Sequence, residues 1–211
     1  MPTVGRMWVQ LAVIAIWVLT AIAFSAGTKK STNAEPTRRR DTTSRIGIGI
    51  VALSFVFSWV GPWWFFMRTP NKPTLPVWAA AIAIALALTG TWFCVAAVRT
   101  LGKQWSITAR VLEQHELVTS GPYNIVRHPI YTGMWALQLA TTIAFSSWIW
   151  WGLVPISTAI YYLGTMVRVS REEKLLREQF GPAFDEYARR VPALLPLGAR
   201  GGSNDASGVS A

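Results

Sequence analysis

The chain has 211 residues, of which 52% are hydrophobic and only 14% are charged, and it contains 12 tryptophans. A soluble domain of this length needs more charged surface than this, so the composition argues against a soluble globular protein and favours a membrane protein. The formal net charge of +10 does not point to a nucleic-acid partner, because the basic residues lie between apolar stretches, where anionic lipid headgroups are the expected counter-charge.

Long apolar stretches dominate the sequence. A helix needs about 20 residues to cross the roughly 30 Å hydrocarbon core of a bilayer. The last stretch is long enough for two crossings, with a turn expected at Ser146-Ser147. Since no stretch alternates with a period of two, the sequence predicts an all-α, polytopic membrane helix bundle with about five transmembrane helices and short amphipathic C-terminal helices. The four stretches are 8–25, 46–67, 76–98 and 130–167.

The distribution of Lys and Arg predicts the orientation of these spans. Most of the 20 basic residues lie in three segments, 26–45, 99–129 and 168–211, which all face one side of the predicted bundle. Because short cytosolic loops are enriched in Lys and Arg, we expect this side to be the cytosol. The sequence therefore predicts an integral protein of a bacterial inner (plasma) membrane, with its N-terminus outside and its C-terminus in the cytosol.

The first apolar stretch allows a second interpretation. Arg6 precedes this stretch and Ala21-Ile22-Ala23 resembles a cleavage site, so residues 1–23 also fit a cleaved signal peptide. Cleavage would turn the remaining spans over and place the basic loops outside, against the charge rule.

Three parts of the chain differ in composition. Residues 1–98 hold three predicted transmembrane helices and a basic cytosolic loop at 26–45. Residues 99–197 hold a cytosolic loop, a two-helix hairpin and C-terminal helices, and they contain nearly all of the informative polar sequence. Residues 198–211 are rich in Gly, Ser and Ala, which predicts a disordered tail. The single Cys94 lies in an apolar run, so the sequence predicts no disulfide framework and no Cys-rich metal site.

Polar residues gather on both sides of the predicted hairpin. Pro129 suits the first turn of a helix, where its missing N–H costs nothing, and this places His128 at or beside the N-cap. Glu172 and Glu173 fall within two turns of the membrane boundary, where a charge is expensive unless it meets water or a partner. Both groups are therefore candidates for a binding site on the cytosolic side.

Apolar residues after the hairpin recur in steps of four. This spacing puts them on one face of a helix, and Gly181-Pro182 interrupts it. The pattern predicts two short amphipathic helices that lie against the bilayer or against the bundle. The residues are Leu176, Phe180, Phe184, Tyr187 and Val191.

Together, these motifs resemble those of the isoprenylcysteine carboxyl methyltransferase family and its phospholipid methyltransferase relatives. The resemblance covers residues 101–196 and rests on the order and spacing of several short motifs around the hairpin. It implies an S-adenosyl-L-methionine-dependent methyltransferase whose cytosolic pocket is formed by the last two spans, the loop before them and the C-terminal helices. The motifs are Val118-Thr119-Ser120-Gly121-Pro122-Tyr123, Arg127-His128-Pro129-x-Tyr131-x-Gly133, Glu172-Glu173 with Leu176, Phe180-Gly181, Tyr187 and Val191-Pro192.

The resemblance also implies roles for single residues. Glu172 and Glu173 would bind the amino or ribose groups of the cofactor, because a carboxylate accepts from both. Arg168 would hold a carboxylate of the cofactor or the acceptor, and with Glu173 it is the predicted catalytic pair. His115 is an open candidate, and no metal site is expected. The predicted cofactor-binding residues are Gln104, Tyr123, Arg127, His128, Pro129, Tyr131, Gly133, Glu172 and Glu173.

Each of these residues also has a purely structural interpretation. His128 fits a helix cap, Glu172 and Glu173 fit a solvated helical turn, and Arg168 fits an anchor at the membrane interface.

Two other functions fit parts of the pattern. A membrane reductase of the sterol or steroid type, which uses NADPH, shares the Arg-His-Pro-x-Tyr-x-Gly element. A non-catalytic membrane subunit that retains the scaffold is the third possibility. For the methyltransferase, the partner is a lipophilic acceptor in the bilayer: an isoprenylcysteine-type carboxylate, a lipid amine, a phenol or a thiol. A carboxylate or thiolate needs no general base, whereas an amine or phenol must lose a proton.

Overall fold

The computed structural model describes residues 2–32, 37–40, 44–68, 74–105, 110–112, 116–145 and 153–196, and these residues are mostly helical. The helices are α1 (Arg6–Thr32), α2 (Ser44–Arg68), α3 (Val77–Leu101), α4 (Pro129–Phe145), α5 (Leu153–Phe180) and α6 (Pro182–Arg190), with short 3-10 helices η1 (Gly102–Gln104) and η2 (Gly121–Asn124). The strands are β1 (Thr3–Gly5), β2 (Thr37–Arg40), β3 (Thr74–Pro76) and β4 (Arg110–Leu112).

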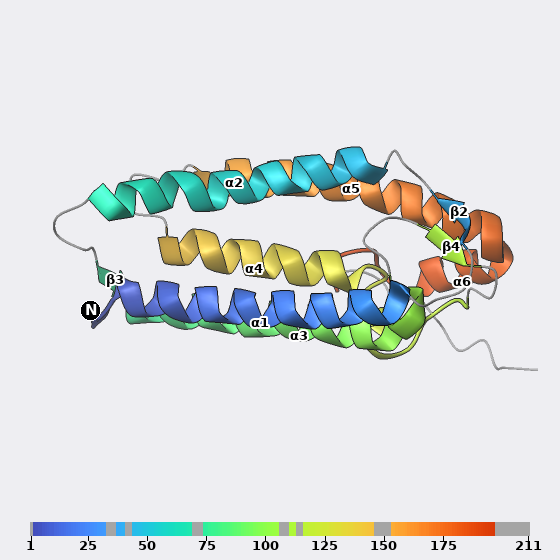
Figure 1. The fold of residues 1–211 in the computed structure, drawn as a ribbon, viewed down its shortest axis with the longest axis horizontal. Coiled ribbons are helices and arrows are strands. Elements are labelled where there is room, and N and C mark those ends of the chain that lie inside the picture. Colours follow the sequence, from blue (N-terminus) through green and yellow to red (C-terminus); the bar gives the residue numbers. More distant parts are fainter. Residues whose placement is uncertain are drawn as a thin grey trace, which may run out of the picture.

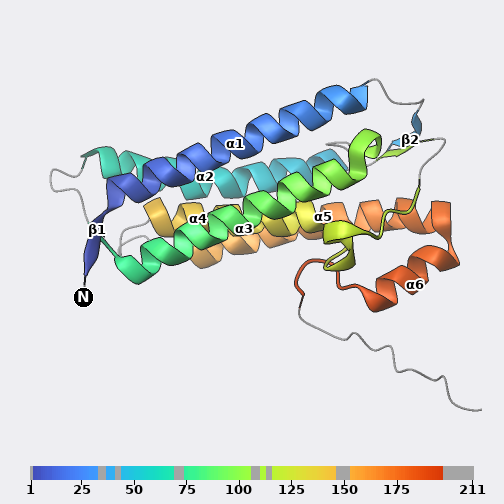
Figure 2. The same cartoon turned by 90° about the horizontal axis from the view of Figure 1, so that it is seen from below.

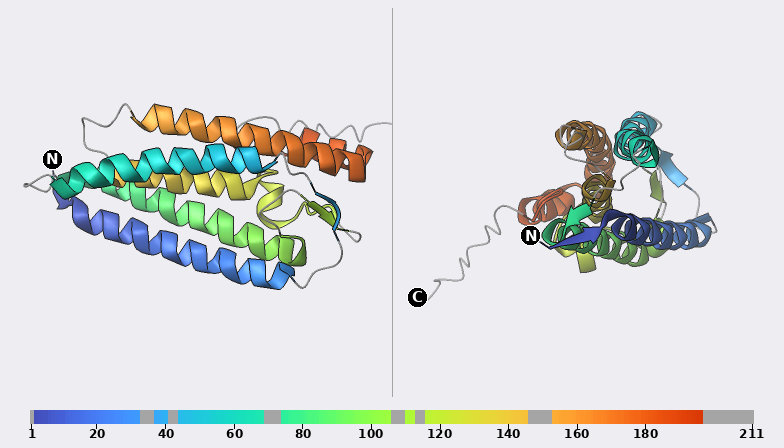
Figure 3. Two further views of the ribbon diagram at one scale, coloured as in Figure 1. Left: turned by 45° about the horizontal axis from the view of Figure 1, so that its top comes forward. Right: turned by 90° about the vertical axis from the view of Figure 1, so that its left-hand side faces the viewer.

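The five long helices run along one common axis, so the mostly helical bundle is confirmed (Figure 1). Helix α3 packs along α4, and α2 packs along α5; these are the two most extensive helix contacts. Figure 3 shows the same order from another side, with α4 between the α2–α5 pair and the α1–α3 pair. Helix α4 is therefore the central element of the bundle.

Glycines allow the closest helix approaches. A Cβ atom added at Gly133 on α4 would lie 2.5 Å from the carbonyl oxygen of Gly90 on α3, so neither position has room for a side chain. On the other pair, a Cβ added at Gly164 of α5 would lie 2.9 Å from the backbone nitrogen of Val51 on α2. Small residues at helix crossings let two backbones come together, as is common between helices in membranes.

Outer surfaces of the bundle carry large apolar side chains. Trp8 is 66% exposed, Leu19 is 62% exposed and Leu163 is 60% exposed, which suits contact with lipid. Two helical segments, Arg6–Gly27 and Val77–Gln104, are long and apolar enough to cross a membrane, and Ile46–Trp59 is a shorter apolar segment. Five crossings and their orientation remain predictions. The expected turn at Ser146-Ser147 and the tail 198–211 lie outside the described residues.

Short β-ribbons close both ends of the bundle, and the all-α prediction missed them. Strand β1 pairs antiparallel with β3, with Val4 opposite Leu75, at the end that holds the N-terminus (Figure 1). Strand β2 pairs antiparallel with β4 at the other end. Segments of three or four residues are too short to show a period-two pattern, so the sequence carried no signal for them.

The C-terminal region differs from the expected two short helices. Helix α5 continues without a break from Leu153 to Phe180, so residues 168–180 extend it rather than form a separate helix. The predicted interruption at Gly181 is confirmed: Gly181 has a positive φ of 52°, which favours glycine, and it turns the chain into α6. Figure 2 shows α6 folded back beside the end of α5.

Helix α6 is amphipathic, and its apolar side faces the protein. Phe184 is 1% exposed and Tyr187 is 4% exposed, and both pack with Val191 against Leu117 and Leu176. The sequence left open whether this face meets the bilayer or the bundle; in the structure it packs against α5 and the segment before α4.

Candidate active site

The N-terminus of α4 is held by the segment that follows α6. The backbone N–H groups of Arg127 and His128 donate to the carbonyls of Pro192 (2.8 Å) and Ala193 (3.0 Å). Thr132, one turn into α4, donates its hydroxyl to the carbonyl of Leu194 at 2.5 Å. Helix α4 begins at Pro129, as the sequence predicted, so His128 directly precedes the helix. These contacts fix the start of α4 against the end of the chain's described part.

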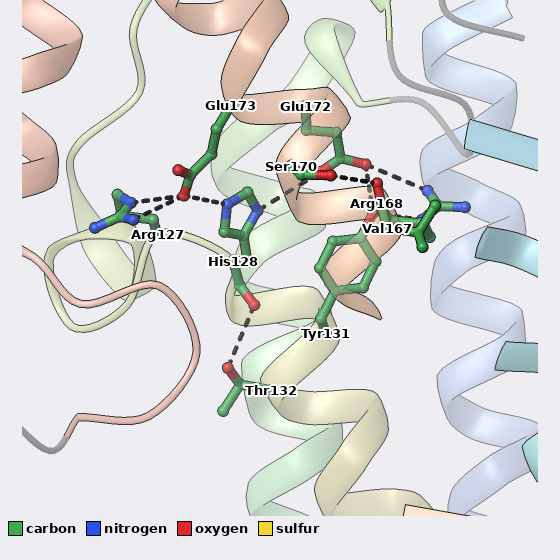
Figure 4. A network of polar contacts seen from close by, with 9 residues as sticks. All are labelled: Arg127, His128, Tyr131, Thr132, Val167, Arg168, Ser170, Glu172 and Glu173. Carbon is green, nitrogen blue, oxygen red and sulfur yellow. Dashed lines mark hydrogen bonds and ion pairs between the residues drawn. The ribbon is translucent and has the colours of Figure 1, made fainter. Parts of the chain in front are cut away.

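A charged group from this start meets the last third of α5 (Figure 4). Arg127 donates two hydrogen bonds to Oε1 of Glu173, from Nε at 3.0 Å and from Nη2 at 2.8 Å. The same carboxylate oxygen lies 3.1 Å from Nε2 of His128. The side chains of Arg127 and Glu173 are 13% and 15% exposed, so this ion pair is largely shielded from solvent.

A second group continues from the other ring nitrogen of His128. Nδ1 of His128 lies 3.5 Å from Oε2 of Glu172. The hydroxyl of Tyr131 donates to Oε1 of Glu172 and accepts a hydrogen bond of 2.6 Å from Nε of Arg168. Nη2 of Arg168 also donates to Glu172, at 3.4 Å. His128 therefore bridges two glutamates, and each glutamate has an arginine partner.

Contacts between the helices orient two side chains of the network, Tyr131 and Arg168. Tyr161 on α5 donates its hydroxyl to the carbonyl of Tyr131 at 2.7 Å, which ties α5 to the first turn of α4. Arg168 lies over the ring of Tyr131, 5.2 Å from its centroid, and its stem passes Gly47 of α2. A Cβ added at Gly47 would lie 2.5 Å from Cγ of Arg168, so α2 makes room for this arginine by having no side chain there.

The ionisation of the network follows from these contacts. Burial alone would raise the pKa of Glu173, but its bonds and charge interactions with His128 and Arg127 lower it to about 2. Burial alone would also raise the pKa of Glu172. The pKa of this carboxyl is nevertheless lowered, by His128, Arg168 and Tyr131 together. Burial alone would lower the pKa of His128, but the two glutamates outweigh burial and raise it. Both glutamates are therefore anions.

The network has a free acceptor for a ligand. All described contacts of Glu173 fall on Oε1, so Oε2 has no partner among the described residues. An ionised carboxylate with one oxygen fixed and the other free suits an ammonium group or a pair of ribose hydroxyls. Arginines beside it suit a carboxylate. The amino acid and ribose parts of S-adenosyl-L-methionine need these partners, so the residues present fit the predicted cofactor.

The structure brings six of the predicted residues together, but not the others. Arg127, His128, Tyr131, Arg168, Glu172 and Glu173 form the network just described. Pro129 starts α4 next to it and is buried. Tyr123 is buried in η2, and its carbonyl accepts from the hydroxyl of Tyr187 at 2.6 Å.

Two predicted cofactor residues lie in other contacts. Gln104 accepts the backbone N–H of Glu116 at 2.9 Å, on the exposed surface. Gly133 faces α3, with Gly90 and Cys94 as its neighbours, and lies on the opposite side of α4 from Tyr131. Its described contacts are those of helix packing. His115 lies outside the described residues.

Sequence reasoning missed the backbone partners of Arg127. Its Nη1 donates to the carbonyl of Ala188 at 2.9 Å and to that of Val191 at 2.5 Å, at the end of α6. Unpaired carbonyls at a helix C-terminus attract a cation, but the sequence cannot say which arginine reaches them. Gly47 and Thr132 were missed for the same reason, since their partners are far away in sequence. Within the described residues, no group of three or more His, Cys, Asp or Glu is placed to hold a metal ion.

Comparison with known proteins gives one family. Residues 82–178 match the family described as Isoprenylcysteine carboxyl methyltransferase (ICMT) family. This range contains the whole charged network.

Similar proteins carry two kinds of name. Nickel-cobalt-cadmium resistance protein NccN of Alcaligenes xylosoxydans xylosoxydans is 29% identical over 74% of this chain and 66% of its own length. Protein-S-isoprenylcysteine O-methyltransferase B of Arabidopsis thaliana is 30% identical over 57% of this chain and 60% of its own length. Protein-S-isoprenylcysteine O-methyltransferase of Xenopus laevis is 28% identical over 69% of this chain and 50% of its own length.

The chain thus spans between half and two thirds of the length of these relatives. The family match, the enzymes named among the relatives and the apolar helices agree with the motifs around α4 and α5. Residues 82–178, which contain the charged network, are therefore similar to the isoprenylcysteine carboxyl methyltransferase family, a family of membrane proteins.

Proposed function

We propose that the protein is an integral membrane methyltransferase that uses S-adenosyl-L-methionine and a lipophilic acceptor. One observation carries the proposal: Arg127 and His128 at the start of α4 meet Glu172 and Glu173 on α5 in one charged network. His128 and Glu173 are 45 positions apart along the chain, and all four residues belong to the part that matches the family. Relatives with methyltransferase names support the same reaction.

When bound, the cofactor would supply a methyl group carried on a positively charged sulfur, and transfer of that methyl group to the acceptor would leave a neutral thioether. Glu173 would hold the ammonium or ribose groups of the cofactor through its free Oε2, while Arg127 and His128 hold Oε1 in place. Arg168 and Tyr131 fix the second carboxylate, that of Glu172. What these residues contribute is positioning and shielding from water, the main needs of an in-line methyl transfer.

The same contacts bear on proton transfer. A carboxylate whose pKa is about 2, as for Glu173, is a weak base at neutral pH. Glu173 therefore serves to bind a cation rather than to remove a proton from the acceptor. A carboxylate or thiolate acceptor needs no base, whereas an amine or a phenol would need a base other than Glu173.

Location follows from the same proposal. The network lies at the end of the bundle that holds α6 and the β2–β4 ribbon (Figures 1 and 2). Most Lys and Arg residues fall in the segments 26–45, 99–129 and 168–211. The described parts of these segments lie at this end, which we infer to be the cytosolic end. The cofactor would reach the network from the cytosol, and the acceptor from the bilayer.

Calorimetry on the purified protein in detergent tests the proposal. We expect S-adenosylhomocysteine to bind and NADPH not to bind. Replacement of Glu173 by Gln should weaken binding at least tenfold, because a charge-assisted contact contributes roughly 1.5–3 kcal/mol. NADPH binding without thioether binding would instead identify a reductase, which shares the Arg-His-Pro-x-Tyr-x-Gly element.

A second candidate role rests on the relative named for resistance to nickel, cobalt and cadmium. In this second role, methyl transfer or contact with a partner protein would contribute to metal resistance. Growth of a deletion strain on these metals, complemented with the wild type or with Glu173→Gln, separates the two. Complementation by the Gln variant would favour a non-catalytic subunit.

A further inference from the structure

Helix α4 carries a polar stripe inside the bundle, made of Tyr131, Trp135, Gln138 and Thr142. Their spacing of three and four residues puts them on one face of the helix. This face looks toward α2 and α5: Tyr131 contacts Arg168, Trp135 stacks on Tyr161, and Gln138 reaches Ser58 and Ser157. The stripe begins at the charged network and leads along α4 into the apolar part of the bundle.

Two polar atoms on this stripe lack a partner among the described residues. The indole Nε1 of Trp135 is buried and donates no hydrogen bond, and the buried Oε1 of Gln138 accepts none. Gln138 is 0% exposed. Buried polar atoms are nearly always satisfied, and most strictly so in a membrane, where water is scarce. An unpaired donor and an unpaired acceptor on one face therefore point to a ligand group that completes both.

The orientation of the Gln138 amide is fixed by its neighbours. Its Nε2 donates to the carbonyl of Ser157 at 3.1 Å and lies 3.4 Å from the hydroxyl of Ser58. A flipped amide would put two oxygens together at Ser157, so Oε1 is the free atom. Three residues along a helix separate Trp135 from Gln138, which places their Cβ atoms about 5–6 Å apart.

Packing around the stripe is uneven. Helices α4 and α5 are consecutive, yet they contact each other at far fewer positions than α3 with α4 or α2 with α5. The ring centroids of Trp135 and Tyr161 are 6.5 Å apart, at the outer limit of the range for aromatic pairs. The backbone of α4 therefore approaches that of α5 at fewer positions than it approaches α1, α2 or α3.

We propose that the stripe binds the methyl acceptor through a neutral hydroxyl that accepts from Trp135 Nε1 and donates to Gln138 Oε1. A carboxylate would meet the Gln138 oxygen as a second acceptor, and an ammonium would meet the Trp135 N–H as a second donor, so a neutral group with both functions is selected. Trp135 and Gln138 lie four and seven residues beyond Tyr131, so this anchor is roughly 6–10 Å deeper along α4 than the network. The anchor is therefore separate from the reacting group.

This inference rests on the proposed methyltransferase function in one respect: it identifies the ligand of the stripe as the methyl acceptor. Its test uses tritiated 1-dodecanol bound to the immobilised, detergent-solubilised full chain, with unlabelled competitors of equal size. We expect unlabelled 1-dodecanol to displace the label at a concentration at least fivefold lower than that needed with two competitors. Undecyl methyl ether can accept a hydrogen bond but cannot donate one, and tridecane can neither donate nor accept. Equal displacement by all three competitors would overturn the proposal and indicate a site filled only by water or by any apolar chain.

Variants test the two atoms separately. Gln138→Met and Trp135→Phe should each weaken 1-dodecanol binding about five- to tenfold, the effect of one lost hydrogen bond. Gln10→Met is the matched control, because Gln10 is a buried glutamine on α1 whose Nε2 donates to the carbonyl of Ala144. Unchanged binding in both stripe variants, or equal loss in the control, would contradict the proposal.

The same preparations separate this inference from the proposed function. S-adenosylhomocysteine should bind the wild type and both stripe variants alike, because neither substitution touches the charged network. If S-adenosylhomocysteine binds but 1-dodecanol is not preferred over its competitors, only the acceptor site is wrong. If S-adenosylhomocysteine does not bind the wild type, the proposed methyltransferase function is wrong.

Discussion

Helices are held together by long charged side chains at one end of the bundle and by close backbone contact at glycines in its apolar interior. At the charged end, the long side chains of Arg127, just before α4, and Glu173, on α5, reach across to each other. In the interior, α3 and α4 meet at Gly90 and Gly133, where the absence of side chains lets the backbones touch. Helix α4 thus turns Tyr131 toward the charged network and Gly133, on its opposite side, toward α3.

The largest expected effect is at the charged end. Replacing Glu173 by Gln leaves Arg127 without its anion in a largely buried place and leaves His128 with Glu172 alone, so the free energy of unfolding should fall by about 2–4 kcal/mol. Denaturation of the purified protein in mixed detergent micelles measures this change.

The control is an exposed ion pair of the same kind. Arg177 and Asp185 lie 2.7 Å apart with side chains about half exposed (53% and 52%), so Asp185→Asn should leave stability unchanged. Equal losses of stability in Glu173→Gln and Asp185→Asn would show that the buried network stabilises the protein no more than an exposed ion pair does.

A somewhat smaller effect is expected in the interior. In Gly133→Ala, the new Cβ would lie 2.5 Å from the carbonyl oxygen of Gly90 and 2.7 Å from Sγ of Cys94. Overpacking of this kind should lower the free energy of unfolding by about 1–3 kcal/mol. Gly49→Ala is the control: a Cβ there meets nothing within 4 Å, and the change should be neutral or stabilise by up to about 1 kcal/mol.

Cofactor binding sharpens the same test. Because Gly133 faces α3, the folded Gly133→Ala protein should keep the wild-type affinity for S-adenosylhomocysteine. A large loss of affinity without loss of stability would return Gly133 to the cofactor site, as the motif implied.

The contact between α4 and the C-terminal segment should contribute less. Thr132→Val removes the hydroxyl that donates to the carbonyl of Leu194, and about 1 kcal/mol of stability should be lost. Limited proteolysis should at the same time cut the segment after Val191 faster. An unchanged cutting rate would show that other contacts hold this segment.

The smallest effect concerns pH. The pKa of His128 is raised above its ordinary value of 6.5, so its protonated form is favoured in the folded state. Its contribution to stability is therefore complete below about pH 6.5 and is lost as the pH rises through the folded-state pKa. Glu173, with a pKa of about 2, stays ionised over this pH range and does not change the dependence of stability on pH.

Unfolding measured from about pH 6 to about pH 9 should show this loss in the wild type but not in His128→Asn. A slope that persists in the variant would assign the titration to another group.

Much of the site was predictable because it obeys local rules. Pro129 marks the start of α4, and a hairpin of two long helices must return Glu172 and Glu173 to the level of His128. The apolar stretches likewise predicted the long helices, since only length and composition matter there.

The rest depends on contacts between distant residues. The continuation of α5 past Arg168 was missed because the charged residues after the apolar stretch suggested a boundary, whereas the ion pair of Arg168 with Glu172, four residues on, lies within one helix. The packing role of Gly133 and the unpaired oxygen of Gln138 depend on which helix faces each side of α4. No pattern in a single sequence contains that information.

The central claim is that the cofactor binds where α4 begins and α5 ends. Ultraviolet cross-linking of methyl-tritiated S-adenosyl-L-methionine to the purified protein, followed by mapping of the labelled peptides, tests it directly. We predict label in the segments 117–131 and 166–194, and its loss in Glu173→Gln. Label in α1 or α2, or label that excess S-adenosylhomocysteine does not suppress, would contradict the account.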